Sequence, residues 1–259
     1  VPHGQPDLAE AELWAVYFDG EHKRVTAVKE IVPFAQARFA SEPLSVRIGT
    51  ATLDGAGLVG EARTGASLIS WKLTYTGDSP PLLLLPARLY GAPLPKAKAL
   101  VGTPLARFSG ELTVDGTRIA IDDWVGSQNH NWGAKHTDRY AWGQVAGFDG
   151  APDAFLECAT ASIKLGPLYT PAMSPMVLRL GDEELRLNAL LTTLRARGKY
   201  GYFHWQLSSR DQHCAMEAHF EAHAADFVAL RYGNPPGGDK TCLNSKIARC
   251  TLIVSRPGK

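Results

Sequence analysis

The residues best suited to chemistry are concentrated in one stretch of the chain, Asp122 to Gly150. It contains two Trp–Gly pairs, two histidines and several side-chain amides in the sequence DDWVGSQNHNWGAKHTDRYAWGQVAGFDG. At the two-residue period of a β-strand, Gln128, His130 and Trp132 share one face. Hydrogen-bonding groups among aromatic rings on one sheet face are typical of a small-molecule site. They also fit a pair of core strands whose polar atoms bond to the backbone, and the sequence leaves both interpretations open.

The second half of the stretch repeats this alternation. One strand face is expected to carry Tyr140, Trp142, Gln144, Ala146 and Phe148. A glycine beside a large ring, as in both Trp–Gly pairs, further predicts a bulky side chain lying over bare backbone.

Glu157 is the acidic residue that could act at this face. It lies in a mostly apolar strand, Phe155 to Leu165, which should pair with the preceding strand through the Asp149-Gly150 turn. If Glu157 shares the ring face with Phe155, burial would raise the pKa of its carboxyl group, so that it could carry a proton near neutral pH. In the alternative orientation Glu157 points outward, and the sequence leaves the two orientations open.

Composition excludes several classes of partner. The formal net charge is +1, from 27 basic and 26 acidic residues with no basic stripe, so nucleic-acid binding is not expected. The longest aliphatic run, Leu82 to Leu85, is far too short to span a bilayer, so no integral membrane segment is expected.

We expect neither a metal nor an organic cofactor. The segment from Glu217 to His223 alternates glutamate and histidine on one strand face. Its two histidines would lie about 13 Å apart at roughly 3.3 Å per residue, too far to share one zinc ion. A solvated outer face is the better interpretation, and no nucleotide-binding or nucleophile motif is present.

Cysteine usage indicates a reducing compartment. The four cysteines form no CxxC pair and include one, Cys158, in an apolar strand. They are expected to be free thiols, although a Cys242–Cys250 disulfide remains open. Because the first residues also lack a secretion signal, we expect a cytoplasmic protein.

The surrounding elements are predicted to be β-strands. Short apolar runs such as Leu13 to Phe18 and Val25 to Val32 recur about every ten residues between glycine turns, which indicates an all-β sandwich or barrel. The prolines from Pro80 to Pro104 should prevent regular structure and form an extended crossover. A hairpin beginning at Phe108 then leads into the central stretch. We place the domain boundary here, giving units of residues 1–105 and 106–259.

The motifs HNWG (His130 to Gly133) and YAWG (Tyr140 to Gly143) resemble the carotenoid hydratase (hydroxyneurosporene synthase) and AttH-like family, which is related to tocopherol cyclase. The similarity extends through ELWAVYFD, LPARLYGAPLPKAK and LNSKIA, and so over most of the chain. It implies two lipocalin-like antiparallel β-barrels in tandem, with an apolar ligand held in a barrel or between the two. Family members usually carry a further segment before the counterpart of Glu12, so the first barrel would be N-terminally incomplete.

The resemblance also implies catalytic residues. In carotenoid hydratases a His-x-Trp pair and a later Tyr-x-Asp pair are implicated in catalysis. His130 and Trp132 match the first pair, and Phe155 and Glu157 align with the second. Glu157 keeps the acid, whereas Phe155 lacks the hydroxyl, so the substrate should differ from that of the carotenoid enzymes.

We therefore predict that the second unit binds a small hydrophobic, isoprenoid-like ligand and catalyses a cofactor-free hydration, cyclisation or isomerisation. Glu157 would be the acid, aromatic rings would face the carbocation, and His130 or Gln128 would position water. The predicted ligand-binding residues are Gln128, Tyr140, Trp142, Gln144 and Phe155. Two alternatives are a non-catalytic carrier of a hydrophobic ligand and an interaction scaffold with an aromatic core.

Overall fold

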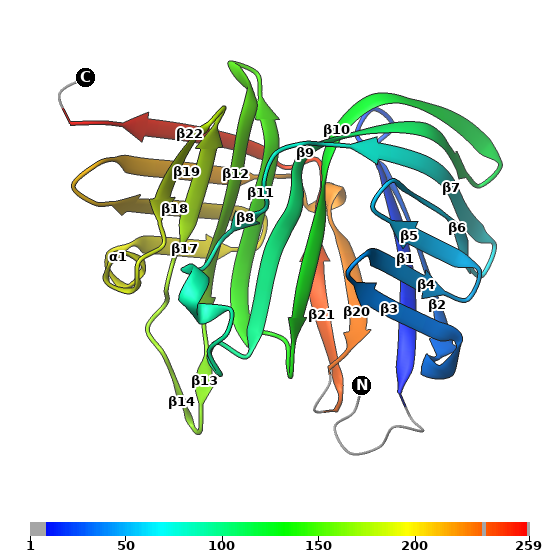
Figure 1. Cartoon of the computed structure of the whole chain (residues 1–259), viewed down its shortest axis with the longest axis horizontal. Helices are drawn as coiled ribbons and strands as arrows, with labels where there is room; N and C mark the ends of the chain where they lie inside the picture. Colours follow the sequence, from blue (N-terminus) through cyan, green and yellow to red (C-terminus); the bar gives the residue numbers. More distant parts are fainter. Residues whose placement is uncertain (1–8, 235–236, 258–259) are drawn as a thin grey trace. The chain divides into compact units, whose positions relative to one another are not determined.

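The computed structural model describes residues 9–234 and 237–257, and it is built almost entirely of antiparallel β-strands (Figure 1). The first eight residues, on which the expected absence of a secretion signal partly rests, lie outside this range. The helical elements of the described part are short: α1 (Leu190–Arg195), η2 (Phe34–Gln36), η3 (Ala87–Leu89) and η4 (Ala224–Asp226). The predicted all-β class is confirmed. In the described part of the chain, no helix is long and apolar enough to cross a membrane.

Two compact units divide the chain, and each draws on separate segments. The first contains the residues up to Gly77 together with Ala106–Gly126 and Ala225–Ile247. The second contains Asp78–Leu105, Ser127–Ala224 and the residues from Ala248 onward. The chain passes from the second unit to the first after Leu105, at the predicted boundary. That it changes unit again after Gly126, Ala224 and Ile247 was not predicted. That residues 1–105 and 106–259 form separate folding domains stays a prediction.

The first unit contains a hairpin, a large sheet and a second hairpin. Strands β1 (Glu10–Asp19) and β2 (Arg24–Pro33) confirm the first two predicted strands. The large sheet continues through β3 (Ala37–Ser41), β4 (Leu44–Ile48), β5 (Ala51–Asp54), β6 (Gly57–Thr64) and β7 (Ser67–Thr76) to β9 (Ala97–Val114) and β10 (Thr117–Gly133). Of the last two strands, only the residues from Ala106 to Gly126 belong to this unit. The second hairpin is β20 (Val228–Gly233) with β21 (Asp239–Asn244). The unit's core is formed by Val28, Ala62, Ile69 and Val114.

The proline-rich crossover is more regular than predicted. A short strand, β8 (Leu82–Leu83), pairs with β9, which begins at Ala97 and continues through Pro104. The expectation that a strand starts only at Phe108 was therefore wrong. Leu105, the next residue, has a positive φ of 52°, so the proline lies beside an irregular point of the strand, where a missing N–H is tolerated.

The second unit contains two four-stranded sheets. One comprises β11 (Arg139–Phe148), β12 (Ala151–Ser162), β15 (Met176–Leu180) and β16 (Glu183–Leu187). The other comprises β17 (Arg197–Gly201), β18 (His204–Arg210), β19 (Ala215–Glu221) and β22 (Arg249–Ser255). A small hairpin, β13 (Lys164–Leu165) with β14 (Leu168–Tyr169), follows β12.

Strand β12 is buried on both faces. On one face, Leu156 and Cys158 belong to the main core of the unit, which they share with Trp205 and other side chains of β15 to β19. On the other face, Phe155 packs in a smaller cluster with Leu82, Leu84, Val101 and Val177. The crossover segment thus covers the face of the sheet that points away from the main core.

The predicted pairing of β11 with β12 through the Asp149-Gly150 turn is confirmed, with Gln144 opposite Glu157. The expectation that Phe148 shares a face with Trp142 was wrong. Gly147 has a φ of +82°, and the register shifts between Ala146 and Phe148. Such a bulge reverses the direction of the next side chain, so Phe148 packs against the main core.

All four cysteines are free thiols in the structure. Burial, and to a lesser extent the charge of Glu157, raises the pKa of the Cys158 thiol well above its usual value. Burial likewise raises the pKa of Cys250 to about 12. These two thiols are therefore neutral near pH 7 and poorly nucleophilic.

Candidate functional site

Glu157 is buried in β12, with 3% of its surface exposed. Trp142 Nε1 donates a hydrogen bond of 2.7 Å to Oε1 of the carboxylate, and Gln144 Nε2 donates one of 2.8 Å to Oε2. Both donors lie on β11, directly across the hairpin from β12. Of the two orientations left open by the sequence, the structure has the one in which Glu157 shares a face with Trp142 and Gln144.

The Gln144 amide connects Glu157 to the end of β10. Its nitrogen also donates to Asn129 Oδ1 at 3.1 Å, and its oxygen accepts a hydrogen bond of 2.6 Å from Ser127 Oγ. Asn129 Nδ2 in turn donates to Ser127 Oγ at 3.1 Å. This network orients the amide so that its N–H points at the carboxylate. Ser127 and Asn129 were missing from the predicted set, although their alternation at the period of two could have indicated them.

Large aromatic side chains at this part of the unit are open to solvent. The exposed fractions are 38% for Trp132 and 37% each for Tyr140 and Trp142. His130, also exposed, stacks on Trp132 with a centroid distance of 5.1 Å, so this pair lies together as the strand period predicted. The term aromatic face is used below for Trp132, Tyr140 and Trp142.

Tyr90, from the crossover, is a residue of this site that sequence reasoning missed. Its ring lies 5.9 Å from that of Trp132, and its hydroxyl donates a hydrogen bond of 2.7 Å to the carbonyl of Ala99. Burial raises the pKa of Tyr90, and the negative charge of Glu157 raises it further. The phenol therefore stays protonated at neutral pH.

Two predicted ligand-binding residues have other surroundings. Phe155 is completely buried in the smaller cluster. Gln128 donates a hydrogen bond to the carbonyl of Asn129, and its side chain lies over Gly102, where a Cβ atom would come within 2.1 Å of Oε1. Among the predicted residues, the structure thus brings Trp142, Gln144 and Glu157 into direct contact, and pairs His130 with Trp132.

The site lies on the face of the β11–β12 sheet that points away from the main core. That core is filled by side chains such as Leu156, Met176 and Leu178, each with no exposed surface. A cavity of about 870 Å³ near α1 and another of about 440 Å³ near Arg38 include neither His130 nor Glu157. The rings through which this site meets solvent are those of the aromatic face.

The arrangement offers proton chemistry beside π-faces. Both oxygens of Glu157 accept N–H donors, contacts that the ionised carboxylate makes best. The neighbouring rings could hold an apolar chain or a developing positive charge. Within residues 9–234 and 237–257, no group of three or more His, Cys, Asp or Glu residues could hold a metal ion.

Comparison with known proteins gives a similarity of fold. No family model and no curated protein matches the chain. The structure is similar to a crystal structure from Nitrosomonas europaea that is provisionally assigned as an AttH. The TM-score is 0.57 and the sequence identity 10%, and the match covers 95% of this chain and 80% of that chain. At this identity the similarity concerns the fold alone, and it fits the predicted lipocalin-like architecture.

Proposed function

We propose that this chain binds a small hydrophobic, isoprenoid-like molecule on the aromatic face of its second unit. The observation that carries the proposal is the Trp142 ring, 37% exposed, whose indole N–H contacts the buried Glu157 carboxylate. Tyr140 lies two residues before it on the same strand, and Trp132 is a further exposed ring on β10. Exposed rings gathered in one place are typical of a binding surface. The AttH-like fold supports the proposal, because it is of the lipocalin-like type.

We further propose that Glu157 acts on this ligand in a cofactor-free hydration, cyclisation or isomerisation. In a hydration, the protonated Glu157 carboxyl would transfer its proton to one alkene carbon as the π bond breaks. Water would then add to the carbocation held against the rings of Trp132 and Trp142, and would return a proton to the carboxylate. The buried position of Glu157 and its contact with the Trp142 indole support this role.

A non-catalytic carrier is the second candidate, and one observation favours it. Both oxygens of Glu157 are already engaged by Trp142 and Gln144, so the carboxylate could serve only to hold these two side chains in place. The open aromatic face would then suffice to bind a hydrophobic molecule.

The first experiment identifies the ligand by native mass spectrometry and solvent extraction of protein purified from its own source. Trp132→Ala should weaken binding of that ligand by roughly tenfold, the loss expected for a well-packed aromatic contact. If Trp132→Ala binds as tightly as the wild type, the aromatic face is not the site.

The Glu157→Gln variant separates the enzyme from the carrier. We expect it to bind the ligand and to lose turnover by at least about 100-fold, because general acid–base catalysis contributes that much. The control is Glu221→Gln, an exposed carboxylate on β19, which should leave turnover unchanged. Undiminished turnover in Glu157→Gln would exclude Glu157 as the acid, and a bound ligand that the wild type leaves unchanged would favour the carrier.

We also propose a cytoplasmic location. The four free thiols, two of them buried, support a compartment in which cysteines stay reduced. Trapping of thiols with an alkylating reagent in intact cells, followed by mass spectrometry, should find all four cysteines unpaired.

A further inference from the structure

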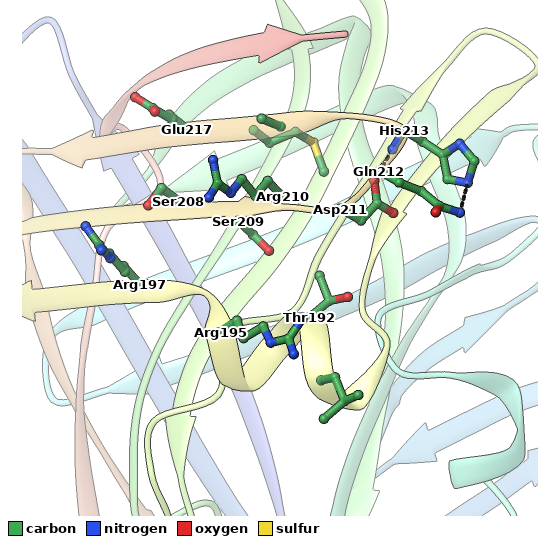
Figure 2. A pocket seen from close by; sticks show the side chains of 13 residues that line it. Thr192, Arg195, Arg197, Ser208, Ser209, Arg210, Asp211, Gln212, His213 and Glu217 are labelled. Carbon is green, nitrogen blue, oxygen red and sulfur yellow. Dashed lines mark hydrogen bonds between the residues drawn. The ribbon is translucent and has the colours of Figure 1, made fainter. Parts of the chain in front are cut away.

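A second feature of this unit lies apart from the aromatic face. A cavity of about 870 Å³ opens beside α1 and strands β17, β18 and β19 (Figure 2). Its polar lining comes from Thr192, Arg195, Arg197, Ser208, Ser209, Arg210, Asp211, Gln212, His213 and Glu217.

Three arginines make this cavity cationic. Arg195 ends α1, Arg197 begins β17 and Arg210 ends β18. Within the described part of the chain none of the three forms an ion pair, so their charges are available to a ligand. Guanidinium groups bind carboxylates and phosphates in a fork geometry, which makes arginine the usual residue for such groups.

Two carboxylates, Asp211 and Glu217, also line the cavity, and both are exposed. Asp211 Oδ1 accepts hydrogen bonds from the backbone amides of His213, at 2.7 Å, and Cys214, at 3.0 Å. Glu217 is opposite Ser208 in the β18–β19 register, whereas Ser209 alternates to the other face of the sheet. Arg197 and Arg210 share the face of Ser208 and Glu217, so Arg195 of α1 is the cation of the lining that lies toward Ser209.

Ser209 is the most buried polar residue of the lining. Only 6% of its surface is exposed, and its Oγ is a buried side-chain atom with no hydrogen-bond partner among the described residues. In Figure 2 the hydroxyl points toward α1, from which Thr192 and Arg195 face the same space. A buried hydroxyl without a partner is costly, so a ligand oxygen that reached Ser209 would gain a hydrogen bond without breaking one inside the protein.

We propose that this cavity binds an oxyanion, the carboxylate or phosphate group of a small molecule. The Ser209 hydroxyl donates to one oxygen, and the Arg195 guanidinium pairs with the same group. Arg197 and Arg210 add positive charge from the other face of β18, where Glu217 partly offsets it. This site is independent of Glu157 and the aromatic face.

The test is a titration of the full chain with inorganic phosphate or acetate at constant ionic strength, followed by calorimetry and by amide NMR shifts. We expect saturable binding, with shifts at Thr192, Arg195 and Ser209. Tighter binding of phosphate would assign a phosphate-bearing ligand, and tighter binding of acetate would assign a carboxylic acid. If neither anion binds saturably, the proposal is wrong.

Two variants test the residues. Ser209→Ala should weaken binding on the order of tenfold, since hydrogen bonds to charged groups are the stronger ones. It should not lower the melting temperature, because the hydroxyl has no partner to lose. Arg195→Gln should weaken binding by at least as much.

The matched control is Lys199→Gln, an exposed cation on β17 that does not line the cavity. It should change the affinity less than twofold. Equal losses in Arg195→Gln and Lys199→Gln would show non-specific charge attraction and overturn the site, as would wild-type affinity in Ser209→Ala.

Discussion

Gly143 is a position in the second unit that leaves no room for a side chain. A Cβ atom there would lie 2.9 Å from the rings of both Trp205 and Phe220, which stack on each other at a centroid distance of 4.8 Å. The prediction that a bulky side chain lies over the glycine of a Trp–Gly pair is confirmed at Gly143, whereas backbone atoms of Lys96 and Ala97 lie nearest to Gly133. The rings come from the opposite sheet of the unit, and not from the adjacent Trp142.

Gly143→Ala should therefore destabilise the protein. Overpacking of a filled core costs about 1–3 kcal/mol in the free energy of unfolding, which urea denaturation measures. The control is Gly150→Ala, in a turn where a Cβ atom would meet no atom within 4 Å. This control should change the free energy of unfolding by less than about 0.5 kcal/mol. Equal stability of the two variants would show that the two rings move aside.

At the scale of elements, Arg179 attaches the crossover to β15. Its guanidinium donates hydrogen bonds to the carbonyls of Pro80 and Pro81 and to Glu184 Oε2, the last at 2.6 Å. Burial by itself would raise the pKa of Glu184, but hydrogen bonds from Arg179 and Arg186 outweigh it and hold the pKa below its usual value. The crossover is thereby held over the smaller cluster of which Phe155 is part.

Arg179→Gln should lower the free energy of unfolding by up to about 3 kcal/mol, because it removes the buried partner of the Glu184 carboxylate and leaves only the exposed Arg186. Arg186→Gln is the matched control, since Arg186 binds the same carboxylate with a side chain that is 66% exposed. Its effect should stay below about 1 kcal/mol, as for other surface ion pairs. Similar urea midpoints for the two variants would contradict a clamping role for Arg179.

The Arg179–Glu184 ion pair also predicts how the free energy of unfolding changes at acid pH. The folded-state pKa of Glu184 is lowered, so its stabilising contribution is present above the unfolded-state pKa of about 4.3 and is lost as the pH falls below it. Urea unfolding between pH 6 and pH 3 should show a shallower loss of stability in Arg179→Gln than in the wild type. Parallel curves would indicate that Glu184 titrates with an ordinary pKa in both proteins.

At the scale of the whole molecule, the two compact units are discontinuous in sequence. Strands β9 and β10 each contain residues of both units. Within the second unit, side chains from residues 78–105 pack over Phe155 and Val177. A fragment that begins at residue 106 therefore lacks Leu82, Leu84 and Val101, which pack against Phe155 and Val177 in the full chain.

We expect a fragment of residues 106–259 to unfold without cooperativity and to bind a dye specific for exposed apolar surface. A fragment of residues 78–259 restores Leu82, Leu84 and Val101 and should bind less of the dye. Circular dichroism during urea denaturation and dye fluorescence measure the two properties. A cooperative transition of native stability in the shorter fragment would instead support the contiguous domains predicted from the sequence.

The sequence by itself determined the all-β class, the β11–β12 hairpin and the face shared by Trp142 and Gln144, whereas the structure decided that Glu157 lies on that face. These features depend on side-chain alternation and on turn residues, which are local properties of the chain. The face shared by Phe155 and Glu157 follows from the same period of two once the turn is placed.

The tertiary structure alone decided the remaining features. The bulge at Gly147 breaks the period of two, so the side of the sheet on which Phe148 lies could not be read from alternation. Tyr90, Arg195 and Ser209 meet their neighbours only after distant segments pack together, and no local pattern encodes such contacts. Burial of both faces of β12 has the same origin, because residues 78–105 and the second sheet of the unit cover it from opposite sides.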